Sequence, residues 1–182
     1  MKPVSQMNKI LFMAVMTLII IALIIIVLLP NESLERLVPE PEGDLYIKQK
    51  SDPERSAKLM QEISAQEALV TTYGIKGLDN SDVRLELLRY SQEDFPQYLE
   101  NHLAGETIFV GGTEIELPCE NIPIEGITVK LCKYESNDFS VIKHTFPLEP
   151  DIIVRVLCTE ASVVTADIHC RQISTRVIEK GT

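Results

Sequence analysis

The feature that most constrains this chain is an apolar run from Ile10 to Leu29, in which Thr17 is the only polar residue among twenty. At a rise of about 1.5 Å per residue, a helix of this length is about 30 Å long, which matches the hydrocarbon core of a bilayer. Lipid offers no hydrogen-bond partner to the backbone, so an unbroken apolar run is typical of a helix. The sequence therefore predicts one transmembrane helix at residues 10–29 that contacts the lipid bilayer.

The residues on either side of the apolar run indicate an uncleaved signal-anchor and its orientation. A cleaved signal peptide has a shorter apolar core and a small-x-small cleavage site, whereas this run ends in Val27-Leu28-Leu29-Pro30. Lys2 and Lys9 precede the run, and mainly acidic residues follow it. Because positive charge favours the cytoplasmic side, we expect a cytoplasmic tail at residues 1–9 and a single-pass protein whose C-terminal part lies outside the membrane.

In outline the chain resembles type IV pilin-like subunits, which also begin with a hydrophobic helix and end in a disulfide-bearing sheet domain. It departs from their pattern because it lacks the processing glycine before the apolar run and the glutamate a few residues into it. Pro30 and the acidic stretch after it also interrupt a continuous spine helix. A pilin-like polymer subunit is therefore an alternative to a simple tether, and processing on the cytoplasmic side would distinguish the two.

The chain is acidic, with a formal net charge of −10. The only charged side chains in the first thirty residues are two lysines, so residues 31–182 carry −12. A domain of this charge is repelled by nucleic acid and by anionic lipid headgroups. With no tryptophan and 5% aromatic residues, it also has few side chains for stacking on bases or sugars. We therefore expect no nucleic-acid partner and no cofactor.

All four cysteines, Cys119, Cys132, Cys158 and Cys170, lie on the predicted outer side of the membrane. An even number of cysteines in an oxidising compartment favours two disulfides. A zinc site is disfavoured, because the sequence has no Cys-x-x-Cys or His-x3-His spacing. Of the three possible connectivities we favour the neighbouring pairs Cys119–Cys132 and Cys158–Cys170. A tight hairpin at residues 160–161 would instead separate Cys158 from Cys170 and favour long-range pairs.

The stretch between the anchor and the domain has the composition of a tether. Residues 30–50 contain three prolines, one glycine and frequent glutamates, and show no sustained periodicity. We therefore predict an acidic linker at residues 30–50 and one extracytoplasmic domain at residues 51–182. A domain of this length can bury a core of its own.

The first half of the domain, residues 51–104, is predicted to be helical. A capping box with an internal proline begins at Ser51, and an apolar stripe at spacings of three and four continues to Tyr73. Gly74 then ends this helix. Three helices are expected in all, at residues 51–73, 79–90 and 91–104.

The second half, residues 106–179, is predicted to be a sheet. The Gly111-Gly112 pair between two alternating runs indicates a tight hairpin with strands at 107–110 and 113–117. Further alternating runs follow at residues 127–134, 140–146, 152–159, 163–170 and 173–178. Consecutive strands joined by short turns favour an antiparallel meander. The predicted fold class is therefore α+β, with short helices first and the meander second.

Candidate catalytic residues do not form a motif. The sequence has no Gly-x-Ser-x-Gly elbow and no phosphate-binding Gly-Lys-Ser/Thr sequence. We predict that His102 is a charge near a helix C-terminus, that His144 is an exposed strand residue and that His169 belongs to the sheet. Glu114 and Glu116 share one strand face, which we expect to be solvated in so acidic a chain.

The sequence as a whole favours a membrane-anchored extracytoplasmic binding or structural module. We expect it to be an accessory component of a cell-envelope assembly that contacts a protein partner through its sheet surface or edge strands. The alternatives are the pilin-like polymer subunit and a membrane-anchored hydrolase. A histidine in a cleft beside a carboxylate and a nucleophile would favour the hydrolase.

Overall fold

The computed structural model describes residues 15–17, 33–104, 106–110, 113–148 and 150–182. The chain divides into residues 1–33 and a compact unit from Leu34 to Thr182. Of the predicted anchor only residues 15–17 are described, and they are helical. The rest of the anchor and the predicted cytoplasmic tail lie outside the described residues. Within the described residues, no helix is long and apolar enough to span a bilayer.

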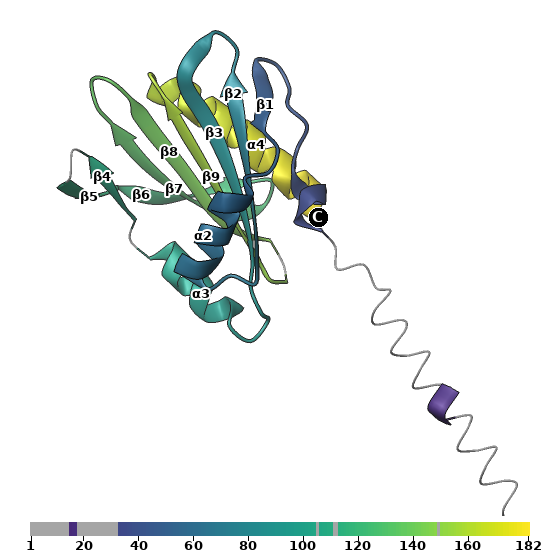
Figure 1. Ribbon diagram of the computed structural model, residues 1–182. Helices are drawn as coiled ribbons and strands as arrows, with labels where there is room; N and C mark the ends of the chain where they lie inside the picture. The colour runs from purple at the N-terminus through teal and green to yellow at the C-terminus, as the bar shows by residue number, and fades with distance from the viewer. Residues whose placement is uncertain (1–14, 18–32, 105, 111–112, 149) are drawn as a thin grey trace, which may run out of the picture. The chain divides into compact units, whose positions relative to one another are not determined.

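The compact unit is built on a seven-stranded sheet with the strand order β1-β2-β3-β9-β8-β7-β6, in which every neighbouring pair is antiparallel (Figure 1). Strands β1 to β3 form one meander and β6 to β9 form another, and the β3–β9 pairing joins the two. The predicted α+β class and antiparallel sheet are thus confirmed. The seven strands are β1 (Leu45–Gln49), β2 (Glu67–Ile75), β3 (Leu78–Arg89), β6 (Cys119–Ile124), β7 (Ile127–Glu135), β8 (Ser140–Leu148) and β9 (Ile152–Glu160).

Helices cover both faces of the sheet (Figure 1). Helix α4 (Val163–Gly181) packs on one face, which we call the first face. Helices α2 (Pro53–Ile63) and α3 (Phe95–Leu103) pack against the second face. The 3₁₀ helix η1 (Leu34–Leu37) precedes β1, and the separate hairpin of β4 (Thr107–Val110) and β5 (Thr113–Glu116) follows α3.

Strand alternation divides the buried side chains between two clusters. On β3, Val83, Leu85 and Leu87 belong to the main cluster under α4, whereas Leu88 belongs to a smaller cluster under α2 and α3. Ile153 lies opposite Leu88 on β9 and joins the smaller cluster. Other positions of the second face carry charged side chains, among them Glu86 and Arg155, so the second face is part apolar and part polar.

The first predicted helix is wrong beyond residue 63. Helix α2 has its proline just inside the start, as predicted, but its N-cap is Asp52 and not the predicted Ser51. Ser64 adopts a left-handed conformation with φ of 55° and ends the helix. Residues 67–75 form β2, because β-branched residues favour a strand whose two faces are both covered. Gly74 lies within this strand, where a Cβ would stand 2.4 Å from the Tyr46 ring. It is a site of close packing and does not end a helix.

The second predicted helix, at residues 79–90, is also wrong, because these residues belong to β3. Val83, Leu85 and Leu87 alternate with charged residues, which is the period of a strand. Leu88 is also apolar, because it packs on the other face of the sheet. As a result, the spacing of the leucines in this segment also fits one face of a helix. The third prediction is confirmed as α3, with Pro96 in its first turn.

The predicted strands at 163–170 and 173–178 are wrong, because both segments belong to α4. Buried residues recur at Ala166, Cys170, Ile173 and Val177, which is the spacing of one helix face. The β-branched residues that begin this segment favour a strand locally, but packing of the apolar stripe on the sheet outweighs that preference. The predicted order of helices first and sheet second is therefore wrong, and so is a sheet extending to residue 179.

The predicted linker is wrong from Leu34 onward. η1 places Leu34 and Leu37 in the main core, and β1 pairs with β2. Strand β6 was not predicted either. Its turn to β7 is formed by Glu125 and Gly126, both with positive φ, which is the geometry of a tight hairpin turn. The predicted hairpin of β4 and β5 and the predicted strands β7, β8 and β9 are confirmed.

Candidate functional site

Charged side chains from three strands gather on the second face of the sheet. Arg84 and Glu86 lie on β3, Arg155 on β9 and Lys143 on β8. The register places Glu86 opposite Arg155, and in the next row it places Arg84 and Lys143 on either side of Leu157. Because directly paired residues point to the same face, these four charged side chains share one surface.

Glu86 is the buried anion of this group, with a side chain that is 4% exposed. Its carboxylate accepts a hydrogen bond from Arg84 Nε at 2.9 Å and lies 3.3 Å from Arg155 Nε. Arg55 of α2 adds a longer contact at 4.0 Å. One buried carboxylate therefore contacts several guanidinium groups, and its removal would leave these cations without their shared counter-charge.

The segment just before β4 supplies the second carboxylate of this group. Lys143 Nζ donates to Glu106 Oε2 at 2.5 Å, and both side chains are largely buried. A cavity of about 170 Å³ lies between these charges. We call this cavity the charged pocket, and it is lined by Arg84, Glu86, Glu106, Thr107, Leu117, Lys143, Arg155 and Leu157.

The charged pocket has more cations than carboxylates, although the chain as a whole is acidic. Three cations face two carboxylates in its lining, whereas the whole chain has 17 lysines and arginines against 27 aspartates and glutamates. Burial, together with the charge of Arg155, lowers the pKa of Lys143. Burial also lowers the pKa of Arg84. These shifts show that the cations are held at an electrostatic cost, which an anion bound in the pocket would reduce.

His102 lies at the edge of the same group of charges. Its Nε2 is 2.8 Å from the hydroxyl of Tyr90, whose ring stacks on Tyr98. Burial and the positive charges of Arg155 and Lys143 lower the pKa of His102 to about 4. His102 does lie in the last turn of its helix, but it is neutral near pH 7. The predicted role as a charge at a helix end is therefore wrong.

His144 is fully buried, so its predicted exposure on a strand is wrong. It points from β8 toward α4, and its Nδ1 is 2.8 Å from Ser174 Oγ. Burial lowers the pKa of His144 to about 4. A serine beside a histidine is part of many hydrolase sites. Ser174 is also fully buried, however, so a substrate cannot reach either side chain in this conformation.

His169 lies on α4, so its predicted place in the sheet is wrong, and it joins three parts of the fold. Its Nδ1 is 2.7 Å from Glu160 at the end of β9, and its Nε2 is 3.1 Å from Asp44 before β1. Arg176, further along α4, pairs with Glu42 at 2.6 Å. We call His169, Glu160 and Asp44 the histidine clasp, because they fasten the segment before β1 to α4.

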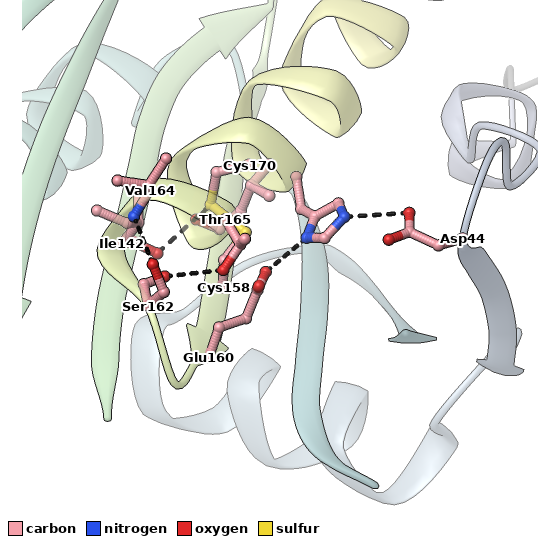
Figure 2. Close-up of polar contacts among 10 residues, drawn as sticks. Asp44, Ile142, Cys158, Glu160, Ser162, Val164, Thr165 and Cys170 are labelled. Carbon is pink, nitrogen blue, oxygen red and sulfur yellow. Dashed lines mark hydrogen bonds and ion pairs between the residues drawn. A yellow bond between two sulfur atoms is a disulfide. The ribbon is translucent and has the colours of Figure 1, made fainter. Parts of the chain in front are cut away.

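Two disulfides join the same pairs that were favoured from the sequence. Cys158–Cys170 connects β9 to α4 beside the histidine clasp, with Cα atoms 5.8 Å apart (Figure 2). Cys119–Cys132 connects directly paired residues of β6 and β7. The sequence-based argument against the Cys158–Cys170 pair assumed a strand at residues 163–170. Because that segment is helical, Cys170 lies on the face of α4 that packs on β9.

Neither the hollow along α2 nor the pair of Glu114 and Glu116 forms a comparable site. A hollow of about 290 Å³ runs along α2, but all of its lining residues belong to that helix and its N-cap, so it is a solvated groove. In the part of the chain that the structure describes, no cluster of three or more His, Cys, Asp or Glu side chains is arranged to hold a metal ion. Glu114 and Glu116 are exposed on β5, as expected for a solvated strand face.

Comparison with known proteins does not identify a family. No family model matches the chain, and no curated protein matches its sequence. Among solved structures, the fold is similar to the extracellular domain of PknH from Mycobacterium tuberculosis, with a TM-score of 0.45 and 10% identity. The alignment covers 76% of this chain and 82% of that one. A likeness this remote assigns no site and no activity.

The charged pocket was not singled out from the sequence, although a signal was present. Arg155 interrupts a strand that is otherwise almost wholly apolar, and Lys143 lies in a strand that is buried along most of its length. A charge at such a position is typical of a side chain that has a partner in the folded domain. The missing information was the long-range pairing of β3 with β9, which brings Glu86 to Arg155.

Proposed function

We propose that this protein is a membrane-tethered extracytoplasmic binding module that holds a small polar ligand in the charged pocket. The observation that carries the proposal is the convergence of three largely buried cations on one cavity lined by only two carboxylates. Arginine and lysine at such positions bind ligands through charge-assisted hydrogen bonds. The rigid sheet below them holds the donors in place, which favours binding of one defined group.

The extracytoplasmic part of the proposal is supported by the two disulfides. Disulfides persist in oxidising compartments and are rare where thiols are kept reduced. The tether is proposed from the apolar run at residues 10–29, whose length suits a bilayer. A protein partner in an envelope assembly is also part of this proposal. Binding of the ligand to the tethered domain can change how the domain contacts a neighbouring protein.

The two alternatives receive less support. The hydrolase alternative required an accessible histidine beside a carboxylate and a nucleophile. His144 has a serine beside it but is fully buried, and the two hydrogen-bond partners of His169 are carboxylates. The pilin-like alternative depends on residues before the apolar run, which lie outside the described residues, and it stays a prediction.

A ligand screen on the full-length chain in detergent micelles tests the proposed site. Small anionic, neutral and cationic compounds would be added at fixed ionic strength while the thermal unfolding midpoint is measured. A ligand that binds only the native state raises this midpoint in a saturable way. We expect at least one class of compound to do so.

Two variants assign the binding to the charged pocket. Lys143→Met removes one cation of the pocket and replaces it with a side chain of similar length. Lys58→Met removes the same charge from α2, where the side chain is 72% exposed. The rise in the midpoint should persist in Lys58→Met and disappear in Lys143→Met. A rise that survives Lys143→Met, or no rise with any compound, would contradict the proposed site.

A further inference from the structure

Lys130, a lysine beside the charged pocket, is buried without a partner in the part of the chain that the structure describes. The residue is 6% exposed, and its Nζ is buried without a hydrogen-bond partner among the described residues. Arg155 Nε is also buried without a hydrogen-bond acceptor there, although Glu86 lies 3.3 Å away. Burying a cationic donor without an acceptor costs free energy. The Arg155 charge is opposed by Glu86, so it is the Lys130 ammonium that favours an acceptor from outside the chain.

The sheet register places Lys130 and Arg155 in one row on the second face of the sheet. Lys130 on β7 pairs with Thr145 on β8, and Thr145 pairs with Arg155 on β9. Lys143 lies two residues before Thr145 and therefore points to the same face. Neighbouring strands are about 4.8 Å apart, so the Lys130 and Arg155 backbones are separated by about 10 Å. Side chains as long as these can reach one bound group from both sides.

A second cavity, of about 240 Å³, gives access to Lys130 from the β6 edge. It is lined by Lys130 together with Cys119, Glu120 and Asn121. Glu120 is the carboxylate of this lining, and Lys133 pairs with it at 3.4 Å. The Glu120 charge is thus partly neutralised by Lys133, whereas Lys130 Nζ has no hydrogen-bond partner among the described residues.

The inference from Lys130 rests on the proposed function and specifies the class of ligand. We propose that the ligand carries a small oxyanion, a phosphate or a carboxylate group, which binds at the Lys130 ammonium, with Arg155 and Lys143 of the same sheet face adding positive charge. An oxyanion accepts charge-assisted hydrogen bonds from both kinds of side chain, and guanidinium geometry suits it well. A cationic ligand would be repelled, and a neutral ligand would leave the Lys130 charge uncompensated.

The test is titration of the full-length chain in micelles with inorganic phosphate and, separately, with succinate, against chloride at equal ionic strength. The thermal unfolding midpoint should rise in a saturable way with phosphate, succinate or both, and the pair of titrations tells a phosphate site from a carboxylate site. Lys130→Met should abolish the rise. Because Lys130 has no partner to lose, this variant should fold at least as well as the native chain in chloride.

Lys58→Met is the control, because it removes the same charge from α2, where the side chain is 72% exposed. It should keep the full rise. Lys130→Gln provides a second, polar replacement and should also abolish the rise, so the test does not depend on one variant. An equal rise in the native chain and in both Lys130 variants would overturn the oxyanion site.

The experiment also separates this inference from the proposed function. If phosphate and succinate have no effect while another compound binds in a way that Lys143→Met abolishes, the pocket binds ligands but the oxyanion class is wrong. If no compound of any class raises the midpoint, both proposals are wrong.

Discussion

The two disulfides close loops of nearly equal length, so comparing them separates chain entropy from packing. Cys119–Cys132 spans 13 positions and Cys158–Cys170 spans 12. The loop-entropy relation gives about 3 kcal/mol of stabilisation for either loop. If entropy were the whole contribution, replacing either pair by alanine would lower the free energy of unfolding by the same amount.

Burial makes the two pairs unequal. Cys158 and Cys170 are both fully buried in the main core between the sheet and α4, whereas Cys119 is exposed at the β6 edge. Removing two buried sulfur atoms leaves a void, which adds about 1–2 kcal/mol to the loss. We therefore expect a loss of about 4–5 kcal/mol for Cys158→Ala/Cys170→Ala and about 3 kcal/mol for Cys119→Ala/Cys132→Ala.

Urea unfolding of both double variants, followed by circular dichroism, measures this difference directly. For a domain of this size the corresponding fall in melting temperature is about 2–4 °C per kcal/mol. An equal loss in the two variants, or a larger loss in Cys119→Ala/Cys132→Ala, would refute the argument from burial. No loss in either would refute a structural role for the disulfides.

Three further perturbations test the charged pocket, the buried histidine and the histidine clasp. Replacing Glu86 by glutamine removes the counter-charge of several guanidinium groups, so urea titration should show a loss of about 3 kcal/mol, against about 0.5 kcal/mol or less for Glu114→Gln on an exposed strand face. The pKa of His144 is lowered to about 4 from an ordinary value of 6.5, so between these values the unfolded state binds more protons. Stability should therefore fall as the pH decreases from about 6.5 toward 4, by about 1 kcal/mol from this group at pH 5.5, and His144→Gln should reduce that slope. Asp44→Asn removes one carboxylate of the clasp, so amide exchange in β1 should become faster relative to β9, and an unchanged ratio by mass spectrometry would contradict the role of the clasp.

The parts of the fold that could be predicted are those whose signals are local. The Gly111-Gly112 hairpin, the proline near the start of α2 and the alternating runs of β7, β8 and β9 follow from turn chemistry and strand period. Neighbouring cysteines also gave the disulfide pairs that the structure contains. Each of these features is specified within about fifteen residues of sequence.

The errors arise where packing on both faces of the sheet hides the period of a strand. Residues 67–89 are apolar on the α4 side and partly apolar on the α2 side, so their pattern fits a helix as well as two strands. The error at α4 was the opposite one, since a helix was predicted as two strands. The β-branched residues at its start favour a strand, and they obscured the buried stripe from Ala166 to Val177. Local sequence could not distinguish these cases, since the deciding contacts are long-range.

The candidate site shows the same limit. Lys130, Lys143 and Arg155 lie on three different strands, and only the register of β7, β8 and β9 gathers them around Thr145. The histidine clasp joins Asp44 to a residue on the last helix. A sequence shows that such charges occupy buried positions, but the pairing of strands decides which of them meet.

The account depends most directly on the compartment of the domain, because an extracytoplasmic binding module must fold where disulfides form. The first measurement is therefore intact mass of the full-length chain after a membrane-permeant alkylating reagent has been added to living cells before lysis. The account predicts a chain without alkyl groups on Cys119, Cys132, Cys158 and Cys170, and with four alkyl groups only when reduction precedes alkylation. Four alkyl groups without reduction would place the domain in a reducing compartment and contradict the proposed topology.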